Sequence, residues 1–260
     1  MSDIVQYEVQ GRVAVITLNR PEARNAVNGD VATGMEAAID RLEAEDGVWA
    51  AVLRANTEGQ TNPVFCAGAD LKAINSGAGG LNTKRGGFAG YVYRERNKPV
   101  VVAVDGLATA GGCEIVLASD IVVATTRSSF GLAEVKRNLI AGAGGLFRLP
   151  RAIGQSNAME MILTGEPLPA ERAHALGLVS RLVAPGEAVA TALEIANKIA
   201  DAAPLAVQAS RRVVLAAAYE DDDTLRRMTD DEFAPLMSSE DLREGLTAFI
   251  EKRAPNWQGR

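Results

Sequence analysis

Two glutamates stand among apolar residues, where a carboxylate is unusual. Glu114 lies in an apolar segment over residues 112–118 that is expected to be helical, and Glu134 follows Phe130-Gly131-Leu132-Ala133. A carboxylate is costly to bury without a partner or a purpose. Buried carboxylates also acquire the shifted pKa values that proton transfer requires. The pair is therefore a candidate general acid and general base.

Glu134 can also be interpreted as a structural residue that forms an ion pair. Lys136 and Arg137 are close enough in sequence to neutralise Glu134 in an ion pair. Glutamates at apolar positions are often structural residues of this kind. The sequence context has to decide between the two interpretations.

Two segments have the pattern of a strand, a turn of small residues and a helix. They read Phe65-Cys66-Ala67-Gly68-Ala69-Asp70-Leu71-Lys72 and Leu107-Ala108-Thr109-Ala110-Gly111-Gly112-Cys113-Glu114. The first N–H groups of a helix lack intrahelical partners, and small residues let a ligand approach them. Such N–H groups can form an oxyanion hole, although each turn alone is also explained by tight packing. Neither segment matches a nucleotide-binding fingerprint.

Other catalytic chemistries have little support in the sequence. Cys66 and Cys113 are far apart and sit beside alanine or glycine, which predicts small buried thiols rather than a disulfide or metal ligands. The single histidine, His174, lies on a helix expected over residues 170–176. A multi-histidine metal site or a Ser-His-Asp triad is therefore not expected.

Composition narrows the class of protein further. The 260 residues include 33 acidic and 27 basic ones, a formal charge of −6, which disfavours general nucleic-acid binding. No apolar run approaches the roughly 20 residues of a membrane span, and the first residues lack the pattern of a secretory leader. We expect a cytoplasmic protein that binds neither nucleic acid nor membrane.

Hydropathy patterns then indicate the elements that position these residues. Residues 3–9 and 12–18 predict a hairpin, and residues 28–45 predict a helix that Asn28 caps. Strands dense in valine and alanine are expected at 49–54, 64–66 and 99–105. Strands of this composition, separated by helices, indicate an α/β fold in which crossover helices cover both faces of the sheet.

The remaining segments are expected to be a loop and then mainly helices. Residues 75–90 are rich in Gly, Ser, Asn and Thr, which predicts a mobile surface loop near the site. Strands largely end after residue 123, and the following helices are expected over residues 142–153, 156–163, 187–202 and 205–219. Residues 221–253 form amphipathic helices whose apolar face packs on a neighbouring subunit or, alternatively, on their own domain.

Several motifs, in one order along essentially the whole chain, resemble the enoyl-CoA hydratase (crotonase) family. They are Leu18-Asn19-Arg20-Pro21 with Asn25-Ala26, Cys66 to Lys72, Val104-Asp105-Gly106 leading to Ala110-Gly111-Gly112-Cys113-Glu114, Ala118-Ser119-Asp120, Phe130 to Glu134, and Gly142-Ala143-Gly144-Gly145 with Arg148-Leu149-Pro150. The resemblance implies a crotonase-like spiral of ββα turns with two nearly perpendicular sheets. It implies a spiral core over residues 1–200 and a helical region over 201–260 that assembles trimers, often paired into hexamers.

The resemblance also implies an acyl-CoA thioester as the partner in the site, with no metal and no redox cofactor. The N–H groups of Ala69 and Gly111 are expected to form the oxyanion hole, and Glu114 and Glu134 to be the catalytic pair that hydratases of the family carry. By the family pattern Glu134 exchanges the proton at C2 of the acyl group, while Glu114 orients and activates water. The residues expected along CoA are Arg24, Ala26, Ala67, Ala69, Asp70, Leu71, Lys72 and Gly111.

The function implied is hydration of a 2-enoyl-CoA to a 3-hydroxyacyl-CoA in fatty-acid or related acyl-CoA metabolism. Residues 86–90 and the tail over 248–260 are similar to the carnitinyl-CoA dehydratase branch, so that reaction is an alternative. Isomerisation and thioester hydrolysis use the same oxyanion hole and are further alternatives. A subunit that binds acyl-CoA without catalysis is the remaining alternative. Ala110 departs from the family, in which many members have glycine at that position.

Overall fold

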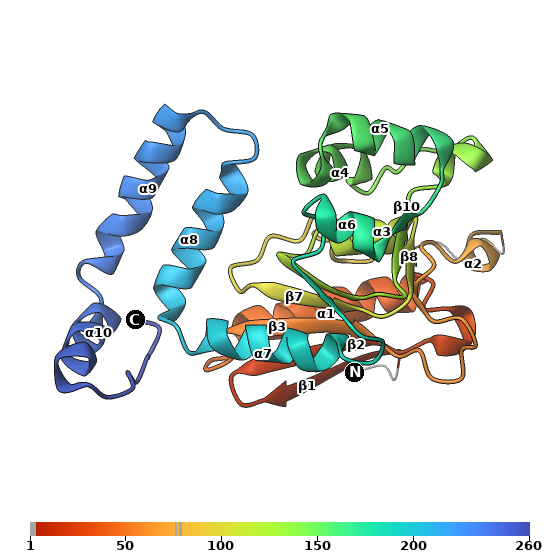
Figure 1. Ribbon diagram of the computed structural model, residues 1–260. Coiled ribbons are helices and arrows are strands. Elements are labelled where there is room, and N and C mark those ends of the chain that lie inside the picture. Colours follow the sequence, from red (N-terminus) through yellow and green to blue (C-terminus); the bar gives the residue numbers. More distant parts are fainter. Residues whose placement is uncertain (1–3, 76, 78–79) are drawn as a thin grey trace.

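The computed structural model describes residues 4–75, 77 and 80–260. Figure 1 shows a body of sheets and helices from which the last three helices, α8 to α10, extend as a separate arm. The glutamates and the small-residue turns belong to the body, so the fold of the body decides the geometry of the site.

The larger sheet has six strands in the order β1-β2-β3-β7-β9-β12. β1 and β2 form an antiparallel hairpin, as the sequence predicts, and each later strand is parallel to its neighbour in the sheet. The strands are β1 (Val5–Gln10), β2 (Val13–Leu18), β3 (Ala50–Ala55), β7 (Val100–Val104), β9 (Ile121–Thr125) and β12 (Arg181–Val183).

Successive residues of these strands bury opposite faces. In β7, Val100, Val102 and Val104 belong to one apolar cluster, while Val101 and Ala103 belong to the other. Helix α7 (Ala188–Ala200) covers the second face, and helix α1 (Gly29–Ala44) and the smaller sheet cover the first. Helices thus cover both faces of the sheet, as expected, and on the first face a second sheet packs beside the helix.

The smaller sheet holds the segments that end in the small-residue turns. Its order is β11-β10-β8-β4, and Figure 1 shows its strands running across the direction of those in the larger sheet. The strands are β4 (Val64–Cys66), β8 (Leu107–Thr109), β10 (Ser129–Gly131) and β11 (Leu168–Pro169). The neighbours β4, β8 and β10 are parallel, so their carboxyl ends lie at one edge.

Two expectations about strands need correction. The strand at 99–105 does not enter the glycine turn directly, because β8 lies between them in the other sheet. Strands do not end after residue 123, since β10, β11 and β12 follow. These strands have only two or three residues each, too few for a periodic pattern to emerge.

The segment over 75–90 also differs from the expected surface loop. β5 (Asn82–Thr83) and β6 (Gly87–Phe88) pair in an antiparallel hairpin, and Phe88 and Ala89 are buried in the core. An ion-pair network fastens this hairpin to α1: Arg85 contacts Glu36 and Asp40, and Gly86 N–H donates to Glu36. Residues 76, 78 and 79 lie outside the described part of the chain.

The helices otherwise follow the apolar periodicity closely. Asn28 caps α1 by accepting a hydrogen bond from Val31 N–H, as expected. The remaining helices are α2 (Leu71–Asn75), α3 (Gly111–Leu117), α4 (Gly145–Ile153), α5 (Gln155–Thr164), α6 (Ala170–Ala175), α8 (Pro204–Ala216), α9 (Asp222–Leu236) and α10 (Glu240–Glu251), with 3-10 turns η1 (Pro21–Ala23) and η2 (Glu134–Arg137). Helix α4 begins three residues later than expected because Gly144 adopts a positive φ of 108°. Across residues 4–75, 77 and 80–260, no helix is long and apolar enough to span a bilayer.

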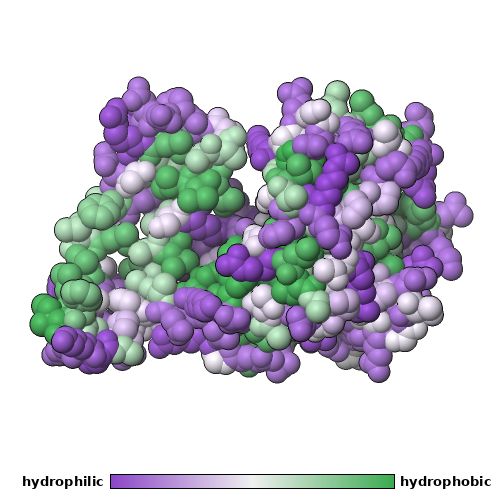
Figure 2. Space-filling view, in the orientation of Figure 1, coloured by the Kyte–Doolittle hydropathy of each residue, from purple (hydrophilic) through white to green (hydrophobic). Residues whose placement is uncertain are grey.

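The arm formed by α8, α9 and α10 exposes large apolar side chains. Phe249 is 84% exposed and Ile250 78%, and α9 buries none of its residues. Figure 2 shows hydrophobic residues gathered over these helices. The alternative that residues 221–253 bury their apolar face on their own domain is therefore wrong.

The C-terminal tail folds back along α10. Both carboxylate oxygens of Asp241 accept backbone N–H groups, from Gln258 and Gly259, and Glu244 accepts that of Asn256. Trp257 packs against the cluster under α7 and donates its indole N–H to Asp201 O. The tail is thus a fastening between the arm and the body.

Candidate active site

Three neighbouring strands deliver the candidate residues to one edge of the smaller sheet. Cys66 pairs with Ala108, and Gly131 pairs with Thr109, so the strands β4, β8 and β10 end side by side. The turns that follow carry Ala69, Gly111 and Glu134. Ligands of α/β proteins commonly bind beyond the carboxyl ends of parallel strands.

The two small-residue turns touch each other. A Cβ atom on Gly68 would lie 2.9 Å from Gly111 N, and one on Gly112 would clash with the carbonyl oxygen of Cys66. The glycines therefore permit a backbone approach that any side chain would block. Neither Ala69 N–H nor Gly111 N–H donates to an acceptor within the described part of the chain. Two free donors thus lie on adjacent turns.

Ala110 precedes the second donor in a strained backbone conformation. Its φ of 51° and ψ of −128° belong to a region that side chains with a Cβ rarely adopt. The residue caps α3, and its carbonyl accepts the N–H groups of Cys113 and Glu114. The conformation explains why glycine suits this position, and the helix still forms with alanine there.

A cavity of about 650 Å³ opens beside these turns and takes in both glutamates. Its wall combines apolar side chains from several elements with the two carboxylates. The lining residues are Ala67, Ala69, Leu71, Leu81, Asn82, Phe88, Tyr93, Thr109, Ala110, Gly111, Glu114, Ala133, Glu134, Arg137, Leu139, Ile140, Gly142 and Ala143. The cavity therefore unites the four catalytic residues that the sequence singles out.

Glu114 is held by backbone donors. Its side chain is almost fully buried, and Oε1 accepts a 2.9 Å hydrogen bond from Gly145 N–H. Burial raises the pKa of Glu114 and the charge of Glu134 acts in the same direction, while N–H groups of Gly145 and Ala143 oppose them. The carboxylate is thereby fixed in orientation and biased toward holding a proton.

Glu134 has a freer carboxyl group. Burial raises its pKa, an effect that the charge of Arg137 opposes. Its Oε2 atom is buried and has no hydrogen-bond partner within residues 4–75, 77 and 80–260. A buried oxygen without a partner is costly in a purely structural residue and suits a group that contacts substrate or water.

The ion-pair explanation for Glu134 is wrong. Lys136 instead pairs with Glu166, with Nζ 2.6 Å from Oε1. Arg137 forms no salt bridge to Glu134 within the described residues, and its Nη1 atom instead donates a long hydrogen bond of 3.5 Å to Ala133 O. The described residues thus leave Glu134 without a basic partner in direct contact.

A clamp supports the turn that holds Glu114. Arg148 donates to Val92 O at 2.6 Å and to Ala143 O at 3.2 Å, while the Tyr93 hydroxyl donates to Gly142 O at 3.0 Å. These contacts fix the turn from which Gly145 N–H reaches Glu114. The glycine-rich block was visible in the sequence, but its role as donor was not.

The residues expected along CoA are near one another but only partly in the cavity. Ala67 N–H donates to Arg24 O, and Asp70 N–H donates to Val27 O, so the segment holding Arg24 and Ala26 runs beside the first turn. Ala67, Ala69, Leu71 and Gly111 line the cavity, whereas Arg24, Ala26, Asp70 and Lys72 do not.

Asp70 also has structural contacts. Its Oδ2 atom accepts from Arg20, whose Nη2 is 3.2 Å away, and its Oδ1 atom accepts the N–H groups of Lys72 and Ala73 at the start of α2. These bonds lower the pKa of Asp70 against the opposing effect of burial. Asp70 therefore holds the turn together whether or not it touches a ligand.

Sequence reasoning did not identify several wall residues. Tyr93 lies beyond the segment over 75–90, and Leu81, Asn82 and Phe88 lie within it without a chemical signature. The one signal was position, since the segment separates the two small-residue turns. Which of its side chains face the cavity depends on the β5–β6 hairpin.

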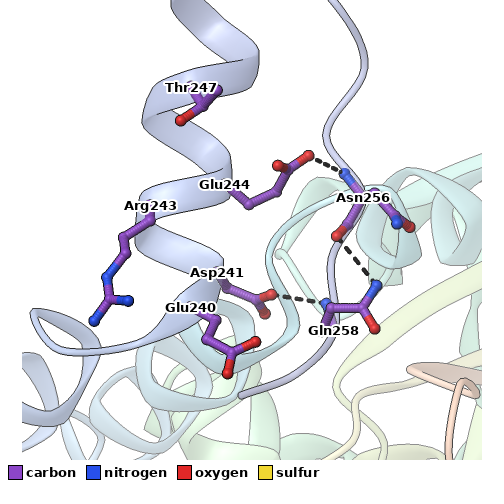
Figure 3. Close-up of a pocket in the computed structure, with 7 residues that line it drawn as sticks. All are labelled: Glu240, Asp241, Arg243, Glu244, Thr247, Asn256 and Gln258. Atoms are coloured by element: carbon purple, nitrogen blue, oxygen red, sulfur yellow. Dashed lines mark hydrogen bonds between the residues drawn. The ribbon is translucent and has the colours of Figure 1, made fainter.

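A second pocket of about 530 Å³ lies between α10 and the tail, and Figure 3 shows its polar lining. Its carboxylates Asp241 and Glu244 already accept backbone N–H groups of the tail. The tail that is similar to the carnitinyl-CoA dehydratase branch thus lies at α10, away from α3, which carries Glu114, and from β10, which precedes Glu134 (Figure 1).

Comparisons with known proteins find relatives along almost the whole chain. The model of the enoyl-CoA hydratase/isomerase family matches residues 8–260. A short-chain-enoyl-CoA hydratase of Clostridium acetobutylicum is 38% identical over 96% of this chain and 95% of its own. Two solved structures are similar over the full length of both chains. An enoyl-CoA hydratase from Mycobacterium tuberculosis is 42% identical with a TM-score of 0.93, and a carnitinyl-CoA hydratase from Mycobacterium avium is 44% identical with a TM-score of 0.78. The expected crotonase-like fold is confirmed, and the chain belongs to the enoyl-CoA hydratase/isomerase family.

Proposed function

We propose that this chain is an enoyl-CoA hydratase, which adds water across the 2,3-double bond of a 2-enoyl-CoA to give a 3-hydroxyacyl-CoA. The observation that carries the proposal is the cavity in which Glu114 and Glu134 face the same space beside two unpaired N–H groups. Relatives named as hydratases match the chain over nearly its whole length.

In the proposed reaction Ala69 N–H and Gly111 N–H form the oxyanion hole. Attack of water at C3 moves negative charge onto the thioester oxygen, and the two donors stabilise the resulting enolate-like transition state. Losing one such donor costs around 3 kcal/mol, on the order of a hundredfold in rate. Support comes from the adjacency of the two turns and the lack of protein acceptors for both groups.

The glutamates divide the proton transfers. Glu114, oriented by Gly145 N–H, positions the water and accepts the proton that it loses on attacking C3. Glu134, whose buried Oε2 has no hydrogen-bond partner among the described residues, donates a proton to C2. Hydroxide adds to C3 and the proton to C2, so one water is consumed and CoA stays attached. Because the two carboxyls interact, they titrate as a pair.

CoA lies, in this proposal, along the first turn. Ala67 and Leu71 at the cavity support the pantetheine arm near the thioester, and Arg24, Ala26, Asp70 and Lys72 line the way outward. Arg24 is exposed and Lys72 lies at the exposed start of α2, so both cations can reach phosphate groups. No metal or redox cofactor enters the reaction that we propose.

A carnitinyl-CoA dehydratase is the second candidate, because named relatives with this activity are 35% identical over the full chain. Its chemistry is the same, and only the acyl group differs. Isomerisation and thioester hydrolysis differ in their products: mass analysis distinguishes them because hydration adds water without releasing CoA. A non-catalytic subunit would bind a panel of enoyl-CoA esters without turnover.

The test is the variant Glu134→Gln assayed with crotonyl-CoA. We expect hydration to fall by at least a thousandfold, since the proton donor is lost, while the affinity for a CoA ester changes little. Glu166→Gln is the matched control, because this exposed glutamate lies near the same 3-10 turn outside the cavity. Full hydratase activity in Glu134→Gln would overturn the assignment.

Two properties of the whole protein belong to the same proposal. The exposed apolar faces of α8 to α10 support assembly into a homotrimer or a pair of trimers, with the arm as the contact. Placement in the cytoplasm rests on the sequence, as does the absence of nucleic acid and membrane among the partners.

A further inference from the structure

One cation stands in the wall of the catalytic cavity. Of the described residues that line it, Arg137 alone is basic, and Glu114 and Glu134 are the acidic ones. The proposed reaction does not require this guanidinium, because the oxyanion is stabilised by backbone N–H groups on the other two turns.

The position of Arg137 relative to the reacting atoms follows from the 3-10 turn η2. Residues three apart in such a helix eclipse one another, with a rise of about 6 Å. Arg137 therefore lies on the same face as Glu134, one turn further along the chain. Leu139 and Ile140 follow at the same wall and are 57% and 69% exposed, so the guanidinium borders apolar surface.

The guanidinium makes one weak hydrogen bond and no salt bridge within the described part of the chain. Its contact to Ala133 O is 3.5 Å, at the limit of a hydrogen bond, and no salt bridge joins it to an acidic side chain in the described part of the chain. The neighbouring Lys136, by contrast, is paired with Glu166 and does not line the cavity. A guanidinium presents five donors in a fork that fits a carboxylate.

We propose that Arg137 selects the acyl group: the enzyme prefers 2-enoyl-CoA esters whose acyl chain ends in a carboxylate. This inference rests on the proposed function and names its substrate class. The carboxylate forms charge-assisted hydrogen bonds with the guanidinium, and the chain between it and C3 lies against Leu139 and Ile140. A chain ending in a trimethylammonium group meets like charge and is disfavoured.

The experiment compares esters whose acyl chains end in a negative, a neutral or a positive group. Wild-type enzyme is assayed with the mono-CoA thioester of a six-carbon 2-enedioic acid, with hex-2-enoyl-CoA of the same length, and with trimethylammonio-crotonyl-CoA. We expect kcat/KM for the carboxylated ester to exceed that for the neutral ester by about tenfold to a hundredfold, the usual worth of a hydrogen bond to a charged group. The cationic ester is expected to be the poorest.

Variants then assign the preference to one side chain. Arg137→Met is expected to bring the carboxylated ester down to the level of the neutral one, chiefly through KM, and Arg137→Lys to retain part of the preference. Lys136→Met removes a positive charge from the same turn outside the cavity, and it should keep the full preference. The ratio between esters is the readout because it cancels any common effect of Arg137 on Glu134.

The outcomes distinguish a failure of selection by Arg137 from a failure of the proposed hydratase function. Equal kcat/KM for the carboxylated and neutral esters in wild type, or an equal loss for both in Arg137→Met, would overturn the selection by Arg137 while hydratase activity stands. An equal loss accompanied by weaker inhibition by free CoA would assign the guanidinium to a CoA phosphate instead. Binding of CoA without turnover of any ester would overturn both proposals.

Discussion

Glu134 and Glu114 are carboxyl groups whose pKa is raised chiefly by burial in the wall of the cavity. This arrangement is unfavourable for folding and useful for catalysis, since a group poised to exchange a proton must have access to both of its states. The stability of the protein should therefore depend on pH in a direction that identifies these groups.

We expect Glu134→Gln to gain stability relative to wild type as pH rises. Because the pKa of folded Glu134 is raised, the folded state binds more protons than the unfolded state above about pH 4.3, so wild-type stability falls as pH rises through the folded pKa. Glutamine does not titrate. Urea unfolding of both proteins at several pH values measures the difference, with Glu166→Gln as the control for a surface charge. A constant difference would contradict the raised pKa.

Ala110 is the second residue whose local cost can be measured. Its positive φ of 51° costs about 1 kcal/mol or more, and glycine adopts that conformation freely. We expect Ala110→Gly to raise the free energy of unfolding by about 1 kcal/mol. Ala118→Gly, at the other end of α3 with a φ of −88°, should lower it. Chemical denaturation compares the two, and destabilisation by both would argue against strain at Ala110.

At the scale of elements, the β5–β6 hairpin forms one side of the cavity, and ion pairs and hydrogen bonds hold it to α1. The β5–β6 hairpin carries Asn82 and Phe88 to the cavity, and Glu36 on α1 accepts hydrogen bonds from Thr83, Arg85 and Gly86. The pKa of Glu36 is lowered, with the bond from Thr83 as the main cause. This side of the cavity is therefore anchored to α1 through Glu36, together with the ion pair between Arg85 and Asp40.

Removing this anchor should affect binding more than chemistry. In Glu36→Ala the hairpin loses its hold on α1, and we expect KM for an enoyl-CoA to rise about fivefold, which corresponds to about 1 kcal/mol, with a smaller change in kcat. Steady-state kinetics measure the two separately. Glu95→Gln, which changes an exposed glutamate outside this network, is the control. A fall in kcat at constant KM would show that the hairpin acts on the reacting atoms instead.

The elements also show where sequence reasoning succeeds. Long segments with one buried face, such as α1 and β7, were predicted within one or two residues, because their periodicity repeats several times. The strands β8 and β10 were not predicted in this way, although they position Gly111 and Glu134. Three residues are too few to show a repeating pattern of buried and exposed positions. The candidate catalytic residues were chosen from their types and motifs, whereas the contact of Gly145 N–H with Glu114 depends on a close approach of the backbone that the sequence does not reveal.

On the scale of the whole molecule, the arm of α8 to α10 lacks a core of its own. Its contacts with the body include ion pairs, such as Arg211 with Asp120 at 2.9 Å, while Phe233 and Phe249 are 58% and 84% exposed. Exposed apolar area of this kind is a common mark of an interface between subunits.

Assembly should therefore depend on these side chains. Wild-type protein is expected to elute with the mass of three or six chains in size-exclusion chromatography with light scattering, and the variant Phe249→Asp with Ile250→Asp to shift toward a single chain. Glu58→Lys, on an exposed loop of the body, should leave the mass unchanged. A wild-type protein with the mass of one chain would contradict the proposed trimer.

The parallel register of β4, β8 and β10 has a consequence for redesign. The donors and Glu134 are spaced by a ladder of backbone hydrogen bonds about 4.8 Å wide, whereas Arg137, Leu139 and the β5–β6 hairpin lie on segments outside that ladder. Substitutions at exposed wall positions such as Leu139 and Ile140 therefore leave in place the strand ladder that spaces the oxyanion donors, whereas Phe88 packs beside Gly111 and has to be kept. A library confined to wall positions should yield altered acyl selectivity at little cost to the hydration step, which makes this scaffold suited to directed evolution of substrate range.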